Sequence, residues 1–316
     1  MQISGVPSVI VLTGATGFIG SATLEALAGR PGVRVRALAR VPGAEREGVE
    51  WVRADLTDPG SLRGVCEDAS ALVHLASYIG RDEERCRAVN VAGTASLLAE
   101  VARAGVKRVV HLSTAAVYGN RPHRDIEVDG IVPDPVSPAS RTRLAAEAPA
   151  LAAGGVVLRP GLVLGAGDRW VVPALAELVS RVPARWDGGR ALLSVVGVTE
   201  LARLIEALAT TSDPFPAGIH HASHPTPVTI GDLMSALTAH GIVPPVEEDW
   251  PWDRCVTALH AHPGVVTERQ FSLLARDYHQ QSAPIWHLTP VGSRTWCQWA
   301  GLSFRAPHTD REDHQK

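Results

Sequence analysis

The sequence predicts an α/β fold in which a doubly wound parallel sheet is followed by a smaller C-terminal lobe. Short apolar runs rich in valine and isoleucine recur in the first half of the chain, at 8–13, 33–38, 71–75 and 106–112. Runs of this length are typical of buried parallel strands, and helical patterns occupy the segments between them. Strands that alternate with helices form a parallel sheet covered on both faces. After Arg159 the alternation weakens, which predicts a separate lobe.

Composition narrows the class of protein. The chain has 316 residues, 45% of them hydrophobic, and a net charge of −3, so it has no general attraction for nucleic acid. No apolar run reaches the ~18 residues of a membrane span, and four scattered cysteines suit a reducing compartment. The cluster of His220, His221 and His224 lacks a further ligand, so we expect no metal site. We expect a soluble cytoplasmic protein that binds neither nucleic acid nor membranes; its oligomeric state is not predicted.

The segment 13–20 places glycines at relative positions 1, 4 and 7 between a predicted strand and a predicted helix. Gly14 permits a tight turn, Gly17 lets the backbone approach a pyrophosphate, and Gly20 lets helix and strand pack closely. The free N–H groups at the start of the helix then face the phosphates. This pattern predicts a Rossmann-type site for a nicotinamide dinucleotide.

The strand–helix alternation and the glycine turn also predict how the chain divides into domains. We assign residues 1–159, together with roughly 191–220, to a dinucleotide-binding Rossmann domain. Residues 160–190 and 221–316 are assigned to a substrate-binding lobe. The segment 121–140 is polar and contains four prolines. We predict that it is a long loop, and long loops in compact domains usually carry function.

The choice between NADPH and NADH depends on the end of the second predicted strand. An acidic residue there would bind the ribose 2′-hydroxyl of NADH, whereas an arginine suits the 2′-phosphate of NADPH. The strand ends at Arg40, and the first acidic residue after it is Glu45. We therefore predict NADPH as the cofactor, with NADH as the less favoured alternative.

Further motifs follow the glycine turn in a fixed order. They are DLTD at 55–58, LVHLAS at 72–77, NVAGT at 90–94, HLSTAAVYG at 111–119 and LRPGLVLG at 158–165. With this set, the chain resembles the extended short-chain dehydrogenase/reductases over nearly its whole length. The resemblance implies that the cofactor is bound by Gly14, Thr16, Gly17, Phe18, Ile19, Gly20, Arg40, Asp55, Leu56, Leu75, Ala76, Ser77, Asn90, Arg143 and Pro160.

The resemblance also implies hydride transfer between the nicotinamide and a carbonyl carbon. In the family a tyrosine donates the proton, a lysine four residues later lowers its pKa, and a serine or threonine binds the carbonyl oxygen. By motif position Thr114 takes the last role, with its neighbour Ser113 as the alternative. The register set by Pro138 and Glu147 puts Ala139 at the tyrosine position and, four residues later, an arginine at the lysine position. The usual proton donor is therefore missing.

The two departures differ in their consequences. Arg143 at the lysine position suits a chain with only two lysines, and it keeps a cation beside the nicotinamide ribose, although its pKa is too high for ready proton relay. Ala139 removes the acid and leaves room for a large substrate. Tyr78 follows the fourth predicted strand, where substrates bind in such sheets, and is a candidate replacement acid. Tyr118 is expected to pack in its motif, and Tyr278 belongs to the far lobe.

Three functions stay open. We favour an NADPH-dependent ketoreductase of antibiotic biosynthesis that acts on an aromatic polyketide, because the departures resemble tyrosine-less ketoreductases of angucyclinones. A phenol beside the substrate ketone would then polarise the carbonyl and protonate the alkoxide. The polycyclic ketone would contact Tyr78, Ser113, Ala139 and Gly161. The alternatives are a nucleotide-sugar epimerase, dehydratase or 4-ketoreductase, and a non-catalytic NADP-binding sensor.

Overall fold

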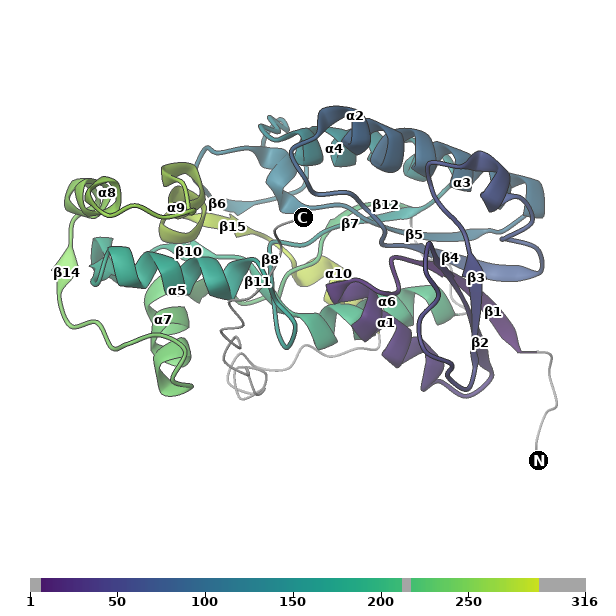
Figure 1. Ribbon diagram of the computed structural model, residues 1–316, viewed down its shortest axis with the longest axis horizontal. Helices are drawn as coiled ribbons and strands as arrows, with labels where there is room; N and C mark the ends of the chain where they lie inside the picture. Colours follow the sequence, from purple (N-terminus) through teal and green to yellow (C-terminus); the bar gives the residue numbers. More distant parts are fainter. Residues whose placement is uncertain (1–6, 212–216, 290–316) are drawn as a thin grey trace, which may run out of the picture.

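The computed structural model describes residues 7–211 and 217–289, and a seven-stranded parallel sheet forms its centre (Figure 1). The strand order is β12-β7-β5-β4-β1-β2-β3. The strands are β1 (Ser8–Thr13), β2 (Val33–Ala39), β3 (Val49–Arg53), β4 (Ala69–His74), β5 (Arg108–Leu112), β7 (Val156–Arg159) and β12 (Gly218–His221). The order reverses between β1 and β4, and ligands bind parallel sheets at the carboxyl ends of strands at such a point. The predicted fold class is confirmed.

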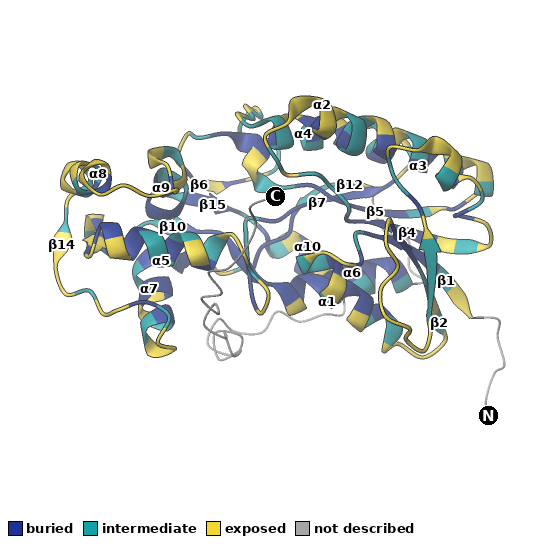
Figure 2. Cartoon of the chain, viewed as in Figure 1, coloured by how far each residue is buried: buried dark blue, intermediate teal, exposed yellow. Residues whose placement is uncertain are grey.

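Helices cover both faces of this sheet, with α1 and α6 on one face and α3 and α4 on the other (Figure 1). Their bounds are α1 (Phe18–Ala28), α3 (Thr94–Ala104), α4 (Pro138–Ala152) and α6 (Val198–Thr210). Alternate strand residues point to opposite faces, so Ile10 packs in the α1/α6 core and Val11 in the α3/α4 core. Figure 2 shows the consequence, since the strands are buried and the outer faces of the helices are exposed.

A second lobe follows β7 and has its own core, in which Trp186 and Phe271 meet edge to face with 4.9 Å between ring centroids. A four-stranded sheet of order β13-β10-β15-β6 and two strand pairs, β8–β11 and β9–β14, build it. The strands are β6 (His123–Ile126), β8 (Leu162–Leu164), β9 (Arg185–Trp186), β10 (Leu192–Leu193), β11 (Val195–Gly197), β13 (Val228–Thr229), β14 (Asp249–Trp250) and β15 (Tyr278–Gln280). The helices are α5 (Val171–Arg181), α7 (Ile230–Ala239), α8 (Trp252–Ala261) and α9 (Glu268–Ala275).

The predicted loop at 121–140 is not entirely a loop. It contains β6, which pairs in parallel with β15 of the second lobe, and its last residues already belong to α4. The partner strand lies about 150 residues away in sequence, so the local polarity of the segment gave no signal of the pairing.

The predicted division into domains differs from the structure in two places. β10 lies within 191–220, yet it pairs with β13 and β15 of the small sheet. Conversely, α10 (Ala283–His287) lies within the predicted substrate lobe, yet Ile285 and Trp286 pack in the α1/α6 core. The chain thus crosses between the two lobes more often than a division by sequence suggests. Residues 1–6, 212–216 and 290–316 of the predicted domains lie outside the described residues. Within the described ranges, no helix is both long enough and apolar enough to cross a membrane.

Candidate active site

The turn between β1 and α1 has the geometry that its glycines predict. Gly14 has a φ of +75°, and a Cβ on it would lie 2.8 Å from the backbone nitrogen of Ala76, just after β4. Gly17 donates its N–H to the Gly14 carbonyl (2.9 Å) and precedes the first residue of α1. A Cβ on Gly20 would lie only 1.8 Å from the Gly14 carbonyl oxygen. A side chain at Gly14 or Gly20 would therefore displace the backbone.

A pocket of about 400 Å³ opens beside this turn, at the carboxyl ends of β1, β2 and β4. The predicted contacts that line it are Gly14, Thr16, Gly17, Arg40, Asp55, Leu56, Leu75, Ala76, Ser77 and Tyr78. Arg85 also lines the pocket, and sequence reasoning missed it. It lies on α2 (Glu83–Cys86), a helix that carries no cofactor motif, so no local pattern could have identified it.

The remaining predicted cofactor contacts lie outside this pocket. Ile19 packs against the α1/α6 core, and Phe18 lies 3.6 Å from the position of a Cβ on Gly167. The Pro160 carbonyl accepts a hydrogen bond from the N–H of Ala115 (2.8 Å). These residues hold α1 and the end of β7 in place around the pocket.

The Asp55 carboxylate is held ready to accept hydrogen bonds. It accepts the backbone N–H (2.9 Å) and the hydroxyl (2.8 Å) of Thr57. These two bonds and the nearby charges of Arg40 and Arg85 lower the pKa of Asp55, although desolvation by itself would raise it. Asp55 is thus ionised at neutral pH and suited to accept a hydrogen bond from the amino group of an adenine.

Asn90 is buried and braces the site from behind rather than lining the pocket, which corrects its prediction as a direct cofactor contact. Its side-chain oxygen accepts the N–H of Tyr78 (2.7 Å), and its amide nitrogen donates to the Tyr78 carbonyl (2.9 Å) and to the Thr142 hydroxyl (2.9 Å). Asn90 lies in the π-helical turn η2 (Arg87–Gly93), a local structure frequent at functional sites. It ties the end of β4 to α4.

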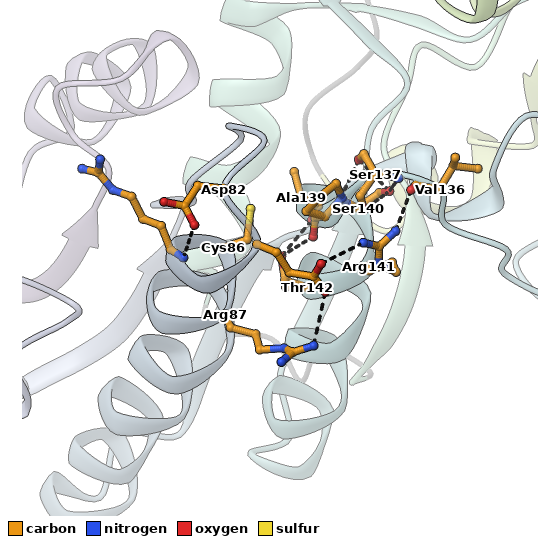
Figure 3. Close-up of polar contacts among 12 residues, drawn as sticks. Asp82, Cys86, Arg87, Val136, Ser137, Ala139, Ser140, Arg141 and Thr142 are labelled. Carbon is orange, nitrogen blue, oxygen red and sulfur yellow. Dashed lines mark hydrogen bonds and ion pairs between the residues drawn. The ribbon is translucent and has the colours of Figure 1, made fainter.

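Helix α4 begins at the position where the family carries its tyrosine. Ser137 and Ser140 form a reciprocal capping box, with a bond of 3.0 Å from the Ser140 N–H to the Ser137 hydroxyl. Thr142 donates its hydroxyl to the Pro138 carbonyl (2.8 Å). Figure 3 shows this first turn of α4 facing Cys86 of α2. Ala139 is half-buried within the turn, so the site presents a methyl group where a phenol is usual.

Thr114 is half-buried at the end of β5 and caps the 3₁₀ helix η3 (Ala115–Tyr118). Its hydroxyl oxygen accepts the N–H of Ala116 (3.1 Å), which leaves the hydroxyl proton for donation to a substrate oxygen. Arg143 donates to the carbonyls of Leu112 (3.2 Å) and Ser113, immediately before Thr114. Burial lowers the pKa of Arg143 to about 10, so it stays charged at neutral pH.

A nicotinamide dinucleotide fits the residues present. Helix α1 has no side-chain cap at Gly17, so its first N–H groups are available to phosphates. Within the described residues, Nε of Arg143 is buried without a hydrogen-bond partner, as expected of a group that binds a ribose hydroxyl. When bound, the dinucleotide supplies or accepts a hydride at its nicotinamide ring.

Two of the predicted substrate contacts are corrected by their surroundings. Ser113 is fully buried and donates its hydroxyl to Glu147, so it cannot reach a substrate. A Cβ on Gly161 would lie 2.2 Å from the Ser194 carbonyl oxygen, which makes Gly161 a packing position. The direction of a side chain at a strand end depends on the neighbouring elements, and a motif position does not specify it.

A buried ionic network lies beneath the candidate catalytic residues. Arg159 forms two hydrogen bonds with Glu147 (2.9 and 2.5 Å), and both side chains are 3% exposed. Arg159 also donates to the Tyr118 hydroxyl (2.8 Å), which lies 2.6 Å from Nε2 of His221. Since Nδ1 of His221 faces the Gln281 carbonyl (3.1 Å), that nitrogen carries the proton and Nε2 accepts from Tyr118. The network joins η3, α4, β7 and β12.

A second buried chain of hydrogen bonds runs from β1 to α3. The Thr13 hydroxyl accepts the N–H groups of Leu75 and Ala76 (both 3.2 Å) and therefore donates to Nδ1 of His74 (2.7 Å). His74 donates from Nε2 to Thr94 (2.9 Å). This arrangement fixes the backbone of β4 at the point where it borders the glycine turn.

Acid is expected to destabilise the fold through two buried histidines. Burial lowers the pKa of His74 and of His221 to about 4, whereas an unfolded histidine titrates near 6.5. The unfolded state therefore binds more protons between pH 6.5 and 4, and stability falls as pH falls through this window. We expect a loss of about 2 kcal/mol per histidine between pH 7 and pH 5, measured by urea unfolding. A His221→Asn variant should lose less over the same interval; an identical loss would contradict the assignment.

Comparison with known proteins places this geometry in a family. The NAD dependent epimerase/dehydratase family matches residues 10–220, which contain the glycine turn, Thr114 and α4. The chain belongs to this family. A 4-hydroxy-2-methyl-3-oxo-4-farnesyl-3,4-dihydroquinoline-1-oxide ketoreductase of Stigmatella aurantiaca is 32% identical over 244 residues, 72% of this chain and 71% of the relative. A 2-alkyl-3-oxoalkanoate reductase of Stenotrophomonas maltophilia (strain K279a) is 29% identical over 286 residues, 84% of each chain.

Solved structures share the fold. MoeE5 in complex with UDP-glucose and NAD superposes with a TM-score of 0.70 and 22% identity, over 94% of this chain and 97% of its own. The family and the reductases among the relatives identify the chain as an NAD(P)-dependent oxidoreductase of the reductase or epimerase type.

Proposed function

We propose that this epimerase/dehydratase family member is an NADPH-dependent ketoreductase that reduces a ring ketone of an aromatic, angucyclinone-type polyketide. One observation carries the proposal. The dinucleotide pocket and Thr114 are intact, while Ala139 replaces the acid that most members need. Such a site suits a substrate that brings its own proton donor. The missing side chain also leaves space for a wide, flat molecule.

NADPH is favoured over NADH by the charge at the end of β2. Arg40 lines the pocket directly after this strand, near the ionised Asp55. Arginine matches the geometry of a phosphate, and the first acidic residue after β2 is Glu45.

The chain's own residues position the carbonyl. The Thr114 hydroxyl donates a hydrogen bond to the carbonyl oxygen, which draws electrons from the carbonyl carbon. The charge of Arg143, held at the end of β5, favours the negative oxygen that develops. NADPH bound beside Thr114 and Arg143 would supply a hydride to the carbonyl carbon held there, and the carbonyl oxygen, as its π bond to carbon breaks, would take a proton.

We place the source of that proton on the substrate because none of the three tyrosines is suited to supply it. Tyr118 is 1% exposed and bound by Arg159 and His221, and burial raises its pKa. Tyr278 donates its hydroxyl to the Asn120 carbonyl (2.6 Å). Tyr78, the predicted replacement acid, lies against Gly80, where a Cβ would be 2.2 Å from its hydroxyl oxygen. A phenol adjacent to the ketone can donate its O–H proton to the new alkoxide, and water then reprotonates the phenolate.

The relatives support a ketone substrate. The Stigmatella aurantiaca relative is named for a 3-oxo-dihydroquinoline, a ketone in a fused ring system, and the Stenotrophomonas maltophilia relative for a 3-oxoalkanoate. An alternative is a function on nucleotide sugars, as suggested by the similar fold of MoeE5, whose complex contains UDP-glucose. Since the catalytic tyrosine is absent here, we rank that alternative lower. A non-catalytic sensor would also lack the tyrosine, but we rank it lower because Thr114 and a cation at Arg143 are retained.

Turnover of substrate classes tests the proposal. Purified protein with NADPH is assayed against angucyclinone-type ketones and against nucleotide-linked keto sugars, with the absorbance of the reduced cofactor as readout. Reduction of the polycyclic ketones alone is the expected result. Reduction of the keto sugars, or binding of NADPH with no turnover of either class, would contradict the proposal.

Replacement of Ala139 by phenylalanine is expected to block a polycyclic substrate. The larger ring fills the space at the first turn of α4, so kcat/KM should fall by about 100-fold, the equivalent of roughly 3 kcal/mol. The dissociation constant of NADPH should change by less than twofold, because Ala139 does not line the cofactor pocket. Ala148→Phe, at an exposed position later in α4, is the matched control. Unchanged turnover of Ala139→Phe would show that Ala139 does not border the substrate.

A further inference from the structure

Two arginines approach the cofactor pocket from different sides. Arg40 follows β2, whereas Arg85 lies on α2, which follows β4. In the sheet, β2 and β4 are the two neighbours of β1, whose carboxyl end carries the glycine turn. The pocket is therefore lined by two positive charges that come from different elements, although only Arg40 lies in a position that the family pattern uses.

The Tyr78 ring holds the side chain of Arg85. The guanidinium carbon lies 4.8 Å from the centroid of that ring, within the range of a cation–π contact. At the start of α2 the Asp82 carboxylate accepts the backbone N–H of Arg85 (3.0 Å). Main chain and guanidinium group are thus both restrained.

Tyr78 is itself fixed. Asn90 binds both its N–H and its carbonyl, and its ring lies against Gly80, which has no side chain to exclude it. The sulfur of Cys86 lies 3.8 Å from the Tyr78 carbonyl oxygen. A rigid aromatic ring below Arg85 reduces the entropy that a long side chain loses when it binds a ligand.

We propose that Arg85 is a second phosphate-binding residue of the dinucleotide site and that Tyr78 positions it. Arg85 donates charge-assisted hydrogen bonds to phosphate oxygens from α2, the helix that follows β4. The phosphate belongs either to the adenosine 2′-position or to the pyrophosphate bridge. If it is the 2′-phosphate, Arg85 strengthens the preference for NADPH over NADH. In that case the role of Arg85 rests on the proposed function. Tyr78 then acts as a positioning residue rather than as a replacement acid.

The test measures dissociation constants of NADPH and of NADH by calorimetry for the wild type and five variants. Arg85→Ala should weaken NADPH about tenfold. A loss confined to NADPH identifies the 2′-phosphate, and an equal loss for NADH identifies the pyrophosphate. Arg87→Ala, a neighbouring arginine that is exposed and outside the pocket, should bind like wild type. If Arg85→Ala binds both cofactors within twofold of wild type, the proposal is overturned.

Two further comparisons separate this proposal from its premises. Arg40→Ala should weaken the binding of NADPH and leave that of NADH unchanged. If the wild type binds NADH more tightly than NADPH, the proposed cofactor choice fails. The effect of Arg85→Ala on the binding of NADH still decides the role of Arg85. Tyr78→Leu should lose part of the affinity lost in Arg85→Ala, and Tyr78→Phe should retain it because the ring remains. Equal losses in both Tyr78 variants would contradict the aromatic contact.

Discussion

Replacement of Gly20 by alanine is expected to abolish dinucleotide binding at micromolar concentrations. Inside a helix, alanine is normally preferred over glycine by about 1 kcal/mol, so propensity alone would predict a more stable protein. Here the new Cβ would lie 1.8 Å from the Gly14 carbonyl oxygen, a contact that only a backbone shift can relieve. The shift would move α1 away from the turn and turn its N–H groups away from the phosphates. We expect the dissociation constant of NADPH to rise at least about 100-fold, which corresponds to roughly 3 kcal/mol.

Gly29→Ala is the matched control, because Gly29 ends the same helix and a Cβ there meets its nearest neighbour at 3.4 Å. It should bind NADPH like wild type and show an unchanged or higher melting temperature. Gly17→Ala, whose Cβ would lie 3.2 Å from the Gly14 oxygen, should fall between the two. Wild-type affinity in Gly20→Ala would show that the packing of α1 on the turn does not control binding.

Replacement of Arg159 by methionine is expected to cost about 3–5 kcal/mol of unfolding free energy. Methionine fills similar volume, but Glu147 is left as a buried carboxylate without its cation, and Tyr118 loses the bond of 2.8 Å from Arg159. Denaturation by urea measures the change through the shift of the midpoint. A loss below 1 kcal/mol would mean that the pair is not buried in solution.

The double variant Arg159→Met, Glu147→Leu distinguishes the effect of an unpaired buried charge from the effect of altered packing. Removing both charges relieves the unpaired carboxylate, so the double variant should be more stable than Arg159→Met alone. Ser113 would lose its acceptor, since it donates to Glu147, and some destabilisation should therefore remain. Additive losses in the double variant would contradict the assignment of an ion pair.

The sequence predicted the parts of the site that depend on local backbone. The glycines at 14, 17 and 20 act through the turn that contains them, so their spacing was sufficient. The residues predicted wrongly were those whose environment comes from elsewhere in the chain. Ser113 points to Glu147 of α4, and Gly161 lies against Ser194 of the second lobe.

Other features had no signal in the sequence for the same reason. Arg85 reaches the pocket from α2 and is held by Tyr78, two elements whose placement follows only from the packed fold. The strand β6 forms because β15 lies beside it. In each case tertiary contacts decide the outcome, and local propensity is a weak guide.

We propose that the substrate, not the protein, donates the proton. The most direct test compares two angucyclinone-type ketones that differ only at the phenol beside the carbonyl, one free and one methylated, in single turnovers with NADPH. We predict rapid reduction of the free phenol and a rate at least about 100-fold lower for the methyl ether, within the range of a lost general acid. Equal rates would place the acid in the protein and contradict the claim.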